Sequence, residues 1–394
     1  MKKLLVIGAG FLQDFVIRKS KSMGYETVAI DADTNAVGFL HADKYSVIDI
    51  VNEKACLEFA QKERVDGVLT AATDYGVLTA SYISEHMGLP GISYEVAQII
   101  KNKYRVRKCL FDKHVDNTEL AYEVNKNTDI ELLKDKLKYP VMVKPCDGSG
   151  SRGVSRVNEM FHLKTACDLA MSASITHRAE IESFIIGKEY GAESLVLGGK
   201  VHVLGIMEKW MTKPPYYAEL GHAIPNDLPP AVEKKVKGCV ESAIVALGIK
   251  SGSVNMDLLI TEIGKVYIVD IGARMGGNMI GPCVIPYGTG IDYMAAMIQN
   301  AVGDTVNLNP SKRRAVATRL LAFKAGVIRK LPNISMIEKQ YGVEIYHHMT
   351  VGKSVREYHT NLDGCGYIVA MDDTVEKAVD KADAVLELIK KNIF

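Results

Sequence analysis

Lys144 and the residues after it are of the types that bind phosphate groups. The lysine lies in the apolar run YPVMVKP (139–145), and residues 147–157 read DGSGSRGVSRV. Glycines let backbone N–H groups turn toward an anion, serine hydroxyls add donors, and a lysine supplies a point charge. The segment therefore predicts a phosphate-binding loop, although a mobile surface loop would have a similar composition. The expected ligands are Lys144, Ser149, Gly150, Ser151 and Gly153.

Two aspartates interrupt apolar runs further along the chain. Asp257 lies within VNMDLLIT (254–261) and Asp270 within KVYIVDIGAR (265–274). A buried carboxylate is costly unless it is paired or binds a metal ion. Two acids on an expected hairpin favour Mg²⁺, or Mn²⁺ in its place, because hard cations prefer carboxylate, phosphate and water oxygens. The alternative is a structural ion pair between Asp270 and Arg274.

A second pair of acids, Glu182 and Glu189, lies in the segment IESFIIGKEY. Alternate residues of a strand face opposite sides, and Gly187 allows a turn between the two acids. Carboxylates accept hydrogen bonds from an adenine amino group or from ribose hydroxyls. Taken alone, the pair is equally consistent with two exposed glutamates on a solvated surface.

Elements must position these residues, and the first hundred residues alternate strands with helices. Strands are expected at 4–10, 27–33 and 66–72, and helices at 11–23, 53–63 and 74–87. Such alternation predicts a parallel sheet with helices on both faces and ligands at the carboxyl ends of its strands.

The turn GAGFLQ (8–13) follows the first expected strand. Asp31 comes roughly twenty residues later, which is the context of a dinucleotide-binding fingerprint. Gln13 replaces the third glycine, however, and many doubly wound domains use such a turn only to enter the helix. A nicotinamide-binding oxidoreductase or sensor is the alternative from another class, but it leaves Lys144 and Asp257 unexplained.

Beyond residue 90 the pattern changes. Helices are expected around 101–113 and 230–247, and strands at 139–145, through 178–211, and at 254–261 and 265–274. After Pro310, residues 314–331 look like paired strands. Residues 372–391 have the period of a helix, with Asp372 or Asp373 as its N-cap. The chain shows no repeat and no long linker, so closely packed domains are expected.

Composition excludes several classes of protein. The 394 residues are 47% hydrophobic and 24% charged, which is ordinary for two or three soluble domains. The 48 basic and 47 acidic residues give a net charge of +1, so neither nucleic-acid nor membrane-surface binding is expected. No apolar stretch approaches the ~20 residues of a membrane span, and the start, MKKLLVIGAGFL, is interpreted as a buried strand. Seven scattered cysteines without a CxxC pair predict free thiols in a reducing cytoplasm.

The three clusters, in this order and spacing, resemble the ATP-grasp superfamily. That superfamily includes D-alanine–D-alanine ligase, biotin carboxylase, carbamoyl phosphate synthetase, purine-biosynthetic ligases and L-amino-acid ligases. The resemblance covers nearly the whole chain and implies a multidomain α/β and α+β fold. It implies a Rossmann-like parallel-sheet domain at 1–95, an ATP-grasp domain at 96–308 and a small C-terminal α+β domain at 309–394. The ATP-grasp domain would consist of two α+β subdomains, at about 96–178 and 179–308.

The resemblance also assigns nucleotide-binding roles residue by residue. Lys103 and Lys144 match the two lysines that reach the nucleotide phosphates, and DGSGSRGV matches the loop that closes over them. Glu182 matches the start of the adenine-binding segment, with Phe184 and Ile185 beside the ring. Glu189 in turn matches the acid that binds the ribose hydroxyls.

The same resemblance makes Asp257 and Asp270 the magnesium ligands and Arg274 the arginine that steadies the transferred phosphoryl group. Most members of the superfamily read E-x-N-x-R where this chain reads Asp270-Ile-Gly272-Ala-Arg274. Because glycine has no side-chain ligand, a second magnesium ion would be bound by Asp270 alone with phosphate and water. One or two metal ions are therefore both open.

The family chemistry implied is the ATP-dependent joining of a small-molecule carboxylate to an amine. The carboxylate attacks the γ-phosphate, the acyl phosphate meets the amine, and phosphate leaves. The string YAELGHAIP (217–225) resembles a stretch in L-amino-acid ligases. Glu219 is then expected to bind an ammonium group and His222 to line the pocket, unless His222 is a structural turn residue. Gly276 and Gly277 are expected to offer N–H groups to a carboxylate.

Two further alternatives concern the activity. Bicarbonate in place of an organic acid would make the chain a carboxyphosphate-forming ligase or carboxylase, and the missing asparagine makes a non-catalytic nucleotide-binding relative conceivable. The acid, the amine and the pathway are not defined by the residues. A homodimer in the cytoplasm, with no nucleic-acid or membrane partner, is compatible with all of these expectations.

Overall fold

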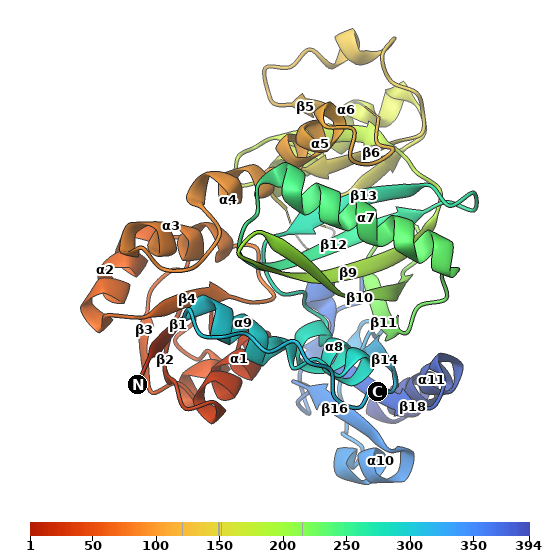
Figure 1. Ribbon diagram of the computed structural model, residues 1–394. Helices are drawn as coiled ribbons and strands as arrows, with labels where there is room; N and C mark the ends of the chain where they lie inside the picture. The colour runs from red at the N-terminus through yellow and green to blue at the C-terminus, as the bar shows by residue number, and fades with distance from the viewer. Residues whose placement is uncertain (120, 149, 151, 215) are drawn as a thin grey trace.

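The N-terminal residues form the expected parallel sheet (Figure 1). A computed structural model of the chain describes residues 1–119, 121–148, 150, 152–214 and 216–394. The sheet has the order β3-β2-β1-β4, with β1 at Lys3–Ile7, β2 at Glu26–Asp31, β3 at Lys44–Val47 and β4 at Gly67–Thr70. β3 was not expected from the sequence, because its four residues are largely exposed and lack an apolar run.

Helices cover both faces of this sheet, as the alternation predicted. Leu4 and Val6 pack with α1 (Phe11–Ser22), whereas Leu5 and Ile7 pack with α2 (Glu53–Glu63) and α3 (Val77–Met87). The alternation follows from the two-residue period of a strand. The predicted bounds of α2 are confirmed.

The GAGFLQ turn is closed by its own side chains. The carboxylate of Asp31 accepts a hydrogen bond from Ala9 N (2.7 Å), and the Gln13 side chain donates to Ala71 O. A Cβ on Gly8 would lie 3.3 Å from Gln13 Cγ, so the glutamine fills the space beside the turn. These contacts use the acid and the space that a dinucleotide would need, and they favour the structural role of the turn.

A small antiparallel sheet follows, in the order β5-β8-β6-β7. Helices α4 (Tyr94–Ile100) and α5 (Lys103–Asp112) lead into it, and α6 (Leu163–Ala173) packs on it. Its strands are β5 at Tyr122–Val124, β6 at Val141–Pro145, β7 at Ser155–Val157 and β8 at Ala179–Ser183. Lys144 lies on β6 and Glu182 on β8. These two strands pair in antiparallel register with Met142 opposite Glu182, so Lys144 is displaced by two residues along β6.

The largest sheet has eight strands in the order β13-β12-β9-β10-β11-β14-β18-β16. Its first five strands are β13 (Val266–Gly272), β12 (Gly252–Ile260), β9 (Lys188–Leu197), β10 (Lys200–Met211) and β11 (Glu219–Ile224). Helix α7 (Pro230–Leu247) packs on this sheet, with the bounds that the sequence predicted. The expected hairpin is confirmed, because Asp257 and Asp270 are register partners on β12 and β13.

The predicted pairing within 314–331 is wrong. Strand β14 (Ala315–Leu320) pairs with β11 and β18 (Gly366–Asp372), and β16 (Val343–His347) closes the edge of the large sheet. The other short strand, β15 (Gly326–Val327), pairs with β17 (Ser354–Val355). The C-terminal strands therefore extend the large sheet, because β18 offers β14 six register partners whereas the neighbouring strand β15 has only two residues.

The last helix, α11 (Val375–Ile393), covers β14 and β18. Its N-cap is Thr374, whose hydroxyl accepts from Lys377 N (3.3 Å). The predicted caps, Asp372 and Asp373, lie two residues and one residue too early, and Asp372 pairs with Lys381 instead. The remaining helices are α8 (Ile285–Thr289), α9 (Tyr293–Ala301) and α10 (Ile334–Tyr341), with short 3₁₀ or π turns at Val37–Leu40, Ile130–Leu133, Met160–His162, Ile280–Val284 and Asn361–Asp363.

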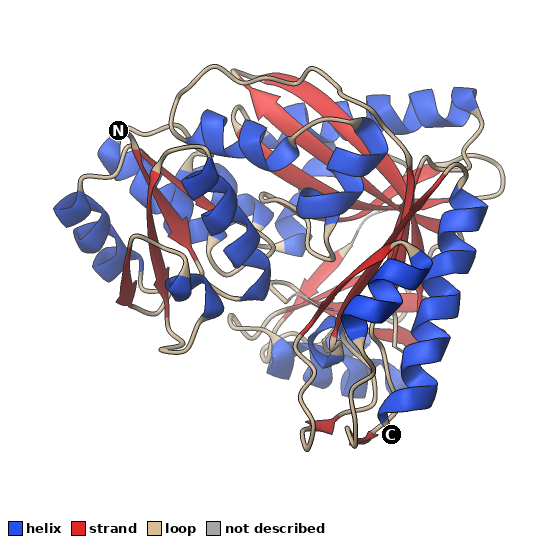
Figure 2. Ribbon diagram, turned by 90° about the horizontal axis from the view of Figure 1, so that it is seen from below, coloured by secondary structure: helices blue, strands red, loops and turns tan. Residues whose placement is uncertain are grey.

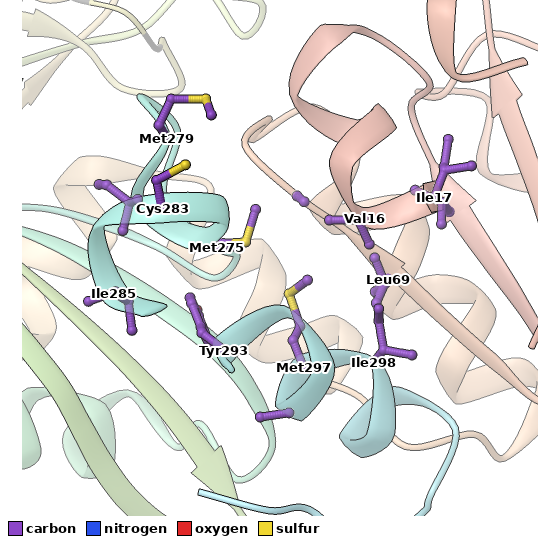
Figure 3. Close-up of a cluster of buried hydrophobic side chains, with 14 of the residues drawn as sticks. Val16, Ile17, Leu69, Met275, Met279, Cys283, Ile285, Tyr293, Met297 and Ile298 are labelled. Atoms are coloured by element: carbon purple, nitrogen blue, oxygen red, sulfur yellow. The ribbon is translucent and has the colours of Figure 1, made fainter. Parts of the chain in front are cut away.

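A shared apolar core joins the N-terminal sheet to the rest of the molecule. Figure 3 shows Val16 and Leu69 facing Met297 and Ile298 of α9. A backbone bridge pairs Ala71 with Met275, so the end of β4 lies beside the segment after β13. Figure 2 shows the N-terminal strands as a group apart from the long strands of the large sheet. In the described parts of the chain, no helix combines the length and apolar character needed to cross a bilayer.

Candidate functional site

A cavity of about 640 Å³ lies between the small sheet, the large sheet and the loop after β4. It brings together most of the residues that the sequence predicted. Those lining it are Lys103, Lys144, Gly150, Glu182, Phe184, Ile185, Glu189, Glu219, His222, Asp257, Asp270, Arg274 and Gly277. Gly153 and Gly276 are not among the lining residues, and Ser149 and Ser151 lie outside the described residues.

Strand register explains how residues so far apart in sequence share one wall. Asp257 of β12 lies between Asp270 of β13 and Gly191 of β9. Residues two positions away lie on the same face of a strand, so Asn255, opposite Gly272, joins Asp257 on this face. One face of the large sheet thus presents oxygen-bearing side chains in adjacent rows.

A β-bulge brings Glu219 and His222 to the same wall. Along the β10–β11 pairing, His222 lies opposite Lys209, but the register shifts after Trp210, so that Glu219 lies opposite Met211. Without the extra residue, two positions an odd number apart would point to opposite faces. Both Glu219 and His222 therefore line the cavity.

Lysines pair with acids at the end of the cavity where phosphates were expected. Lys144 forms an ion pair with Glu182, and Lys103 forms one with Asp270. Arg107 of α5, which the sequence interpretation missed, also binds Glu182 (3.1 Å) and is only 6% exposed at its side chain. The cluster therefore places three largely buried, ion-paired cationic groups close to β6 and β8 of the small sheet and to β13.

The loop after β6 depends on its glycines. Gly153 has a φ of +70°, and a Cβ there would lie 2.8 Å from Ala173 Cβ. A Cβ on Gly148 would lie 2.9 Å from Pro145 Cβ. Gly153 thus serves the close packing of the loop on α6, while Gly150 lies on the cavity wall.

Apolar side chains line the part of the cavity near Glu189. Phe184 and Ile185 lie there with Met142, Leu259 and other apolar residues. The Arg156 guanidinium covers the Phe184 ring, 4.2 Å from its centre. Glu189 lies at this end as well, and burial raises the pKa of its carboxyl group. The surroundings suit a flat aromatic ring with a polar edge.

Lys209 is the main cavity residue that the sequence interpretation missed. Its side chain is 1% exposed, and its Nζ lies 2.7 Å from both Asp257 and Glu219 and 3.9 Å from Glu189. Burial would lower the pKa of Lys209, but the surrounding carboxylates raise it, so the ammonium group stays charged. The available signal was a lysine in the otherwise apolar strand VLGIMEKW.

Glu219 is the centre of a polar cluster on the cavity wall. Its second oxygen accepts from the Asn278 and Asn361 amides, and its backbone N–H binds Asn361 Oδ1 (3.1 Å). Burial opposes ionisation, yet Lys209 and its neighbours lower the pKa of Glu219 to about 2. Glu219 is therefore a fixed anion that lines the cavity.

His222 is buried, 1% exposed, and neutral near pH 7. Burial lowers the pKa of the imidazole to about 4. Its Nδ1 finds no hydrogen-bond partner among the residues that the structure describes. A buried polar atom without a partner is costly, so this atom is available to a ligand in the cavity.

Arg274 pairs with Asp74 and not with Asp270, so the structural alternative raised by the sequence is wrong. Two hydrogen bonds, of 2.9 and 3.1 Å, join the guanidinium to the Asp74 carboxylate. Burial would raise the pKa of Asp74, but the arginine lowers it. Gly276 N–H is also used inside the protein, because it donates to Glu193 (3.0 Å).

The residues fit one divalent cation completed by phosphate. Asp257 and Asp270 present carboxylates on facing strands, both on the cavity. Mg²⁺ prefers one or two carboxylates together with phosphate oxygens and water. In the described part of the chain, no third acid, histidine or cysteine completes a metal site with them.

Comparison with known proteins agrees with this geometry. A family model described as "ATP-grasp domain" matches residues 137–282, and one described as "L-amino acid ligase C-terminal domain 2" matches residues 319–393. The solved structure of L-amino acid ligase from Bacillus licheniformis has a TM-score of 0.84 at 21% identity, covering 100% of this chain and 98% of that one.

Two curated relatives extend the comparison. The uncharacterized protein y4rH of Sinorhizobium fredii is 24% identical over 375 residues, 90% of this chain and 77% of that protein. D-alanine–D-alanine ligase of Staphylococcus epidermidis is 27% identical over 220 residues, 54% of this chain and 54% of that protein. The alignment thus spans about half the length of that ligase.

The chain contains an ATP-grasp domain and has the mixed α/β multidomain fold of ATP-grasp ligase structures. Residues 319–393 match an L-amino acid ligase C-terminal domain, and the matched domains together with the ligase relatives indicate an enzyme of the carboxylate–amine ligase branch, which forms carbon–nitrogen bonds.

Proposed function

We propose that the protein uses ATP to join the carboxylate of a small molecule to an amine, through an acyl-phosphate intermediate, with an amino acid among its substrates. One observation carries the proposal. A single cavity holds the phosphate-type lysines, the facing acids Asp257 and Asp270, and the fixed anion Glu219. Phosphoryl transfer and capture of an ammonium group would therefore occur side by side.

The nucleotide is proposed to lie between the small and the large sheet. Lys103, Lys144 and the loop residues Ser149, Gly150, Ser151 and Gly153 would bind its phosphates. The ring would lie against Phe184 and Ile185 beside Glu182, where the lining is apolar, and Glu189 would accept hydrogen bonds from the ribose hydroxyls.

Ion pairs in the cavity would exchange partners when nucleotide and metal bind. Lys103 pairs with Asp270, and Lys144 with Glu182. Phosphates attract the lysines, and Mg²⁺ or Mn²⁺, held by Asp257 and Asp270, neutralises phosphate charge when bound. The acids and lysines would thus neutralise each other until the phosphates of ATP pair with the lysines and the metal ion pairs with the acids.

The chemical step would be the attack of a carboxylate oxygen on the γ-phosphorus. The bond from that phosphorus to the β–γ bridging oxygen breaks, and ADP leaves. Arg274 would hold the equatorial oxygens through N–H groups of Nη1 and Nη2, because its Nε–Nη2 edge is bound to Asp74. The amine nitrogen then attacks the acyl carbon, phosphate leaves, and the nitrogen loses a proton, which yields the amide.

The substrates would meet at the polar end of the cavity. Glu219 would bind an ammonium group, and Lys209, 2.7 Å from Glu219 and from Asp257, is placed to bind a carboxylate between them. His222 would accept or donate one hydrogen bond as a neutral imidazole, and Gly277 would offer its N–H from the loop after β13. An amino acid has both charged groups that this arrangement can bind.

Three broader features belong to the same proposal. The functional units would be 1–95, 96–308 (about 96–178 and 179–308) and 309–394, with the cavity between them. The seven cysteines are all free thiols, which suits a reducing compartment such as the cytoplasm. A homodimer is compatible with this arrangement, because the cavity is built within one chain.

Release of ADP tests the activity. The full-length protein is mixed with ATP, Mg²⁺ and pairs drawn from a panel of amino acids, and ADP and the condensed product are measured. ADP and product are expected only when both substrates are present, and hydroxylamine added with one acid should yield a hydroxamate from the acyl phosphate. Lys144→Ala should abolish both signals, whereas Lys138→Ala, at an exposed position, should keep them.

Other outcomes would contradict the proposal. ADP release that needs bicarbonate and no organic acid would identify carboxyphosphate chemistry. Nucleotide binding without any turnover across the panel would identify a non-catalytic relative. Binding of NADH with no binding of ATP would exclude the ATP-grasp activity altogether.

A further inference from the structure

The guanidinium of Arg274 lies in the space that a side chain at position 272 would fill. A Cβ built on Gly272 would be 3.0 Å from Arg274 Cζ and 3.2 Å from each terminal nitrogen. Gly272 follows Asp270 by two residues on the same face of β13, opposite Asn255. The glycine therefore lets the arginine lie flat beside the two aspartates.

Two other residues hold the guanidinium in this position. Asp74 accepts hydrogen bonds from Nε (2.9 Å) and Nη2 (3.1 Å), and Asn255 Oδ1 lies 3.4 Å from Nη1. The backbones are tied as well, because Ala72 N donates to Met275 O (3.0 Å). Arg274 is thus fixed from the loop after β4 and from β12 together.

Few oxygens remain for a second metal ion. Asn255 donates its amide N–H to Glu193 (2.9 Å), which directs its oxygen toward Arg274. One Asp270 oxygen accepts from Ile271 N (3.0 Å). Within the described residues, the two aspartates form no metal-binding group with a third acid, histidine or cysteine.

We propose that Arg274, clamped by Asp74 over Gly272, takes the place of a second divalent cation, so that the site holds one metal ion per nucleotide. The inference rests on the proposed binding of ATP. A guanidinium is always charged, and its planar fork matches phosphate oxygens. It supplies positive charge beside the γ-phosphate without needing the oxygen ligands that a metal requires. Asp74 acts through Arg274 as a positioning residue.

Counting bound Mn²⁺ tests the stoichiometry. The full-length protein with a saturating non-hydrolysable ATP analogue is titrated with Mn²⁺, and free Mn²⁺ is followed by its EPR signal. One Mn²⁺ per protein–nucleotide complex is expected, and free Mg²⁺ added beyond MgATP should not raise turnover. Two bound ions, or activation by free Mg²⁺, would overturn the inference while leaving the ligase proposal intact. A protein that binds no nucleotide would instead contradict the proposed function.

Variants of Gly272 test why the site binds one metal ion. Gly272→Asn displaces the guanidinium and adds an oxygen, so two Mn²⁺ ions are expected in this variant. Gly272→Ala displaces the guanidinium without adding an oxygen, so one ion and an at least tenfold lower kcat are expected. One ion in Gly272→Asn, or unchanged kcat in Gly272→Ala, would overturn the role assigned to this glycine. Melting temperatures show whether each variant is folded.

Asp74→Asn tests the clamp separately. The asparagine removes the charge that orients Arg274, so kcat should fall at least tenfold while the ATP KM and the Mn²⁺ count stay the same. Asp74→Glu, which retains the carboxylate, should recover part of kcat. If Asp74 were only structural, the melting temperature would fall and activity would follow the folded fraction, which would overturn its positioning role.

Discussion

Lys209 and Glu219 lie 2.7 Å apart, the lysine almost fully buried and the carboxylate on the cavity wall. The pair means that the proposed ammonium-binding anion is already partly neutralised. A substrate ammonium group must therefore share Glu219 with Lys209, and a substrate carboxylate would favour that sharing by binding the lysine.

We expect Lys209→Met to shift the pH dependence of amine binding. Lys209 lowers the pKa of Glu219 to about 2, so Glu219 is anionic throughout the usual pH range. Without the lysine, the pKa of Glu219 should rise. On acidification, the KM for the amine should therefore begin to increase at a higher pH in the variant than in the wild type. KM measured from pH 5 to 8 checks this, with Lys213→Met, at an exposed position, as control. An unshifted profile would remove Lys209 from the site.

Glu189→Ala should raise the KM for ATP more than it lowers kcat. The variant leaves the ribose hydroxyls without a charged acceptor, a loss of roughly 1.5–3 kcal/mol for such hydrogen bonds. That corresponds to a KM about ten- to a hundredfold higher. Steady-state kinetics measure it, and Glu262→Ala, at an exposed position in the β12–β13 turn, should behave like the wild type. An equal KM for the variant and the wild type would place Glu189 outside the nucleotide site.

Arg274→Lys should lower turnover while leaving ATP affinity nearly unchanged. Lysine keeps the charge but cannot reproduce the two-pronged contact with Asp74 or with phosphate oxygens. A well-placed charged donor contributes about a hundredfold to a thousandfold in rate, so at least a tenfold loss in kcat is expected. Calorimetry, thermal melting and kinetics on one preparation separate this from loss of folding. Weaker ATP binding with unchanged kcat would contradict the assignment.

Glu193→Gln should change how stability depends on pH. Burial raises the pKa of Glu193 from 4.5 to about 7, so the folded protein keeps a proton there that the unfolded chain loses. The wild type therefore loses stability relative to the variant as the pH rises from 4.5 to about 7, and the difference is constant above that range. At about 1.4 kcal/mol per pKa unit, the change is on the order of 3 kcal/mol.

Denaturant unfolding at pH 5, 6, 7 and 8 measures the Glu193 effect. The Glu241→Gln variant, changed at an exposed helix position, provides the reference. A difference between Glu193→Gln and the wild type that does not vary with pH would mean that Glu193 is already ionised in the folded protein at low pH.

Local patterns in the sequence determined the elements and many of the cavity residues. The helices at Glu53–Glu63 and Pro230–Leu247 were predicted with their bounds, because apolar period and flanking turn residues are local. The facing positions of Asp257 and Asp270 followed from two adjacent strands joined by a short turn. A hairpin is the one strand pairing that neighbouring residues can specify by themselves.

Tertiary structure decided which distant residues meet. Asp74 and Arg274 are brought together by the backbone bridge between Ala71 and Met275, and nothing near either residue in the sequence indicates it. The pairing of β14 with β11 and β18 was likewise missed. Strand patterns show which face is buried, but the choice of partner depends on which edge the packed core leaves open.

The buried charges likewise separate what the sequence determines from what the tertiary structure decides. Lys209 in VLGIMEKW is visible as a charge within an apolar strand, but its acidic partners come from three other strands. The one-residue bulge that turns both Glu219 and His222 to the cavity exists only in the pairing of β10 with β11. The sequence thus determined the inventory of chemical groups, and the register between strands decided which of them share a site, because a shift of one residue moves a side chain to the opposite face.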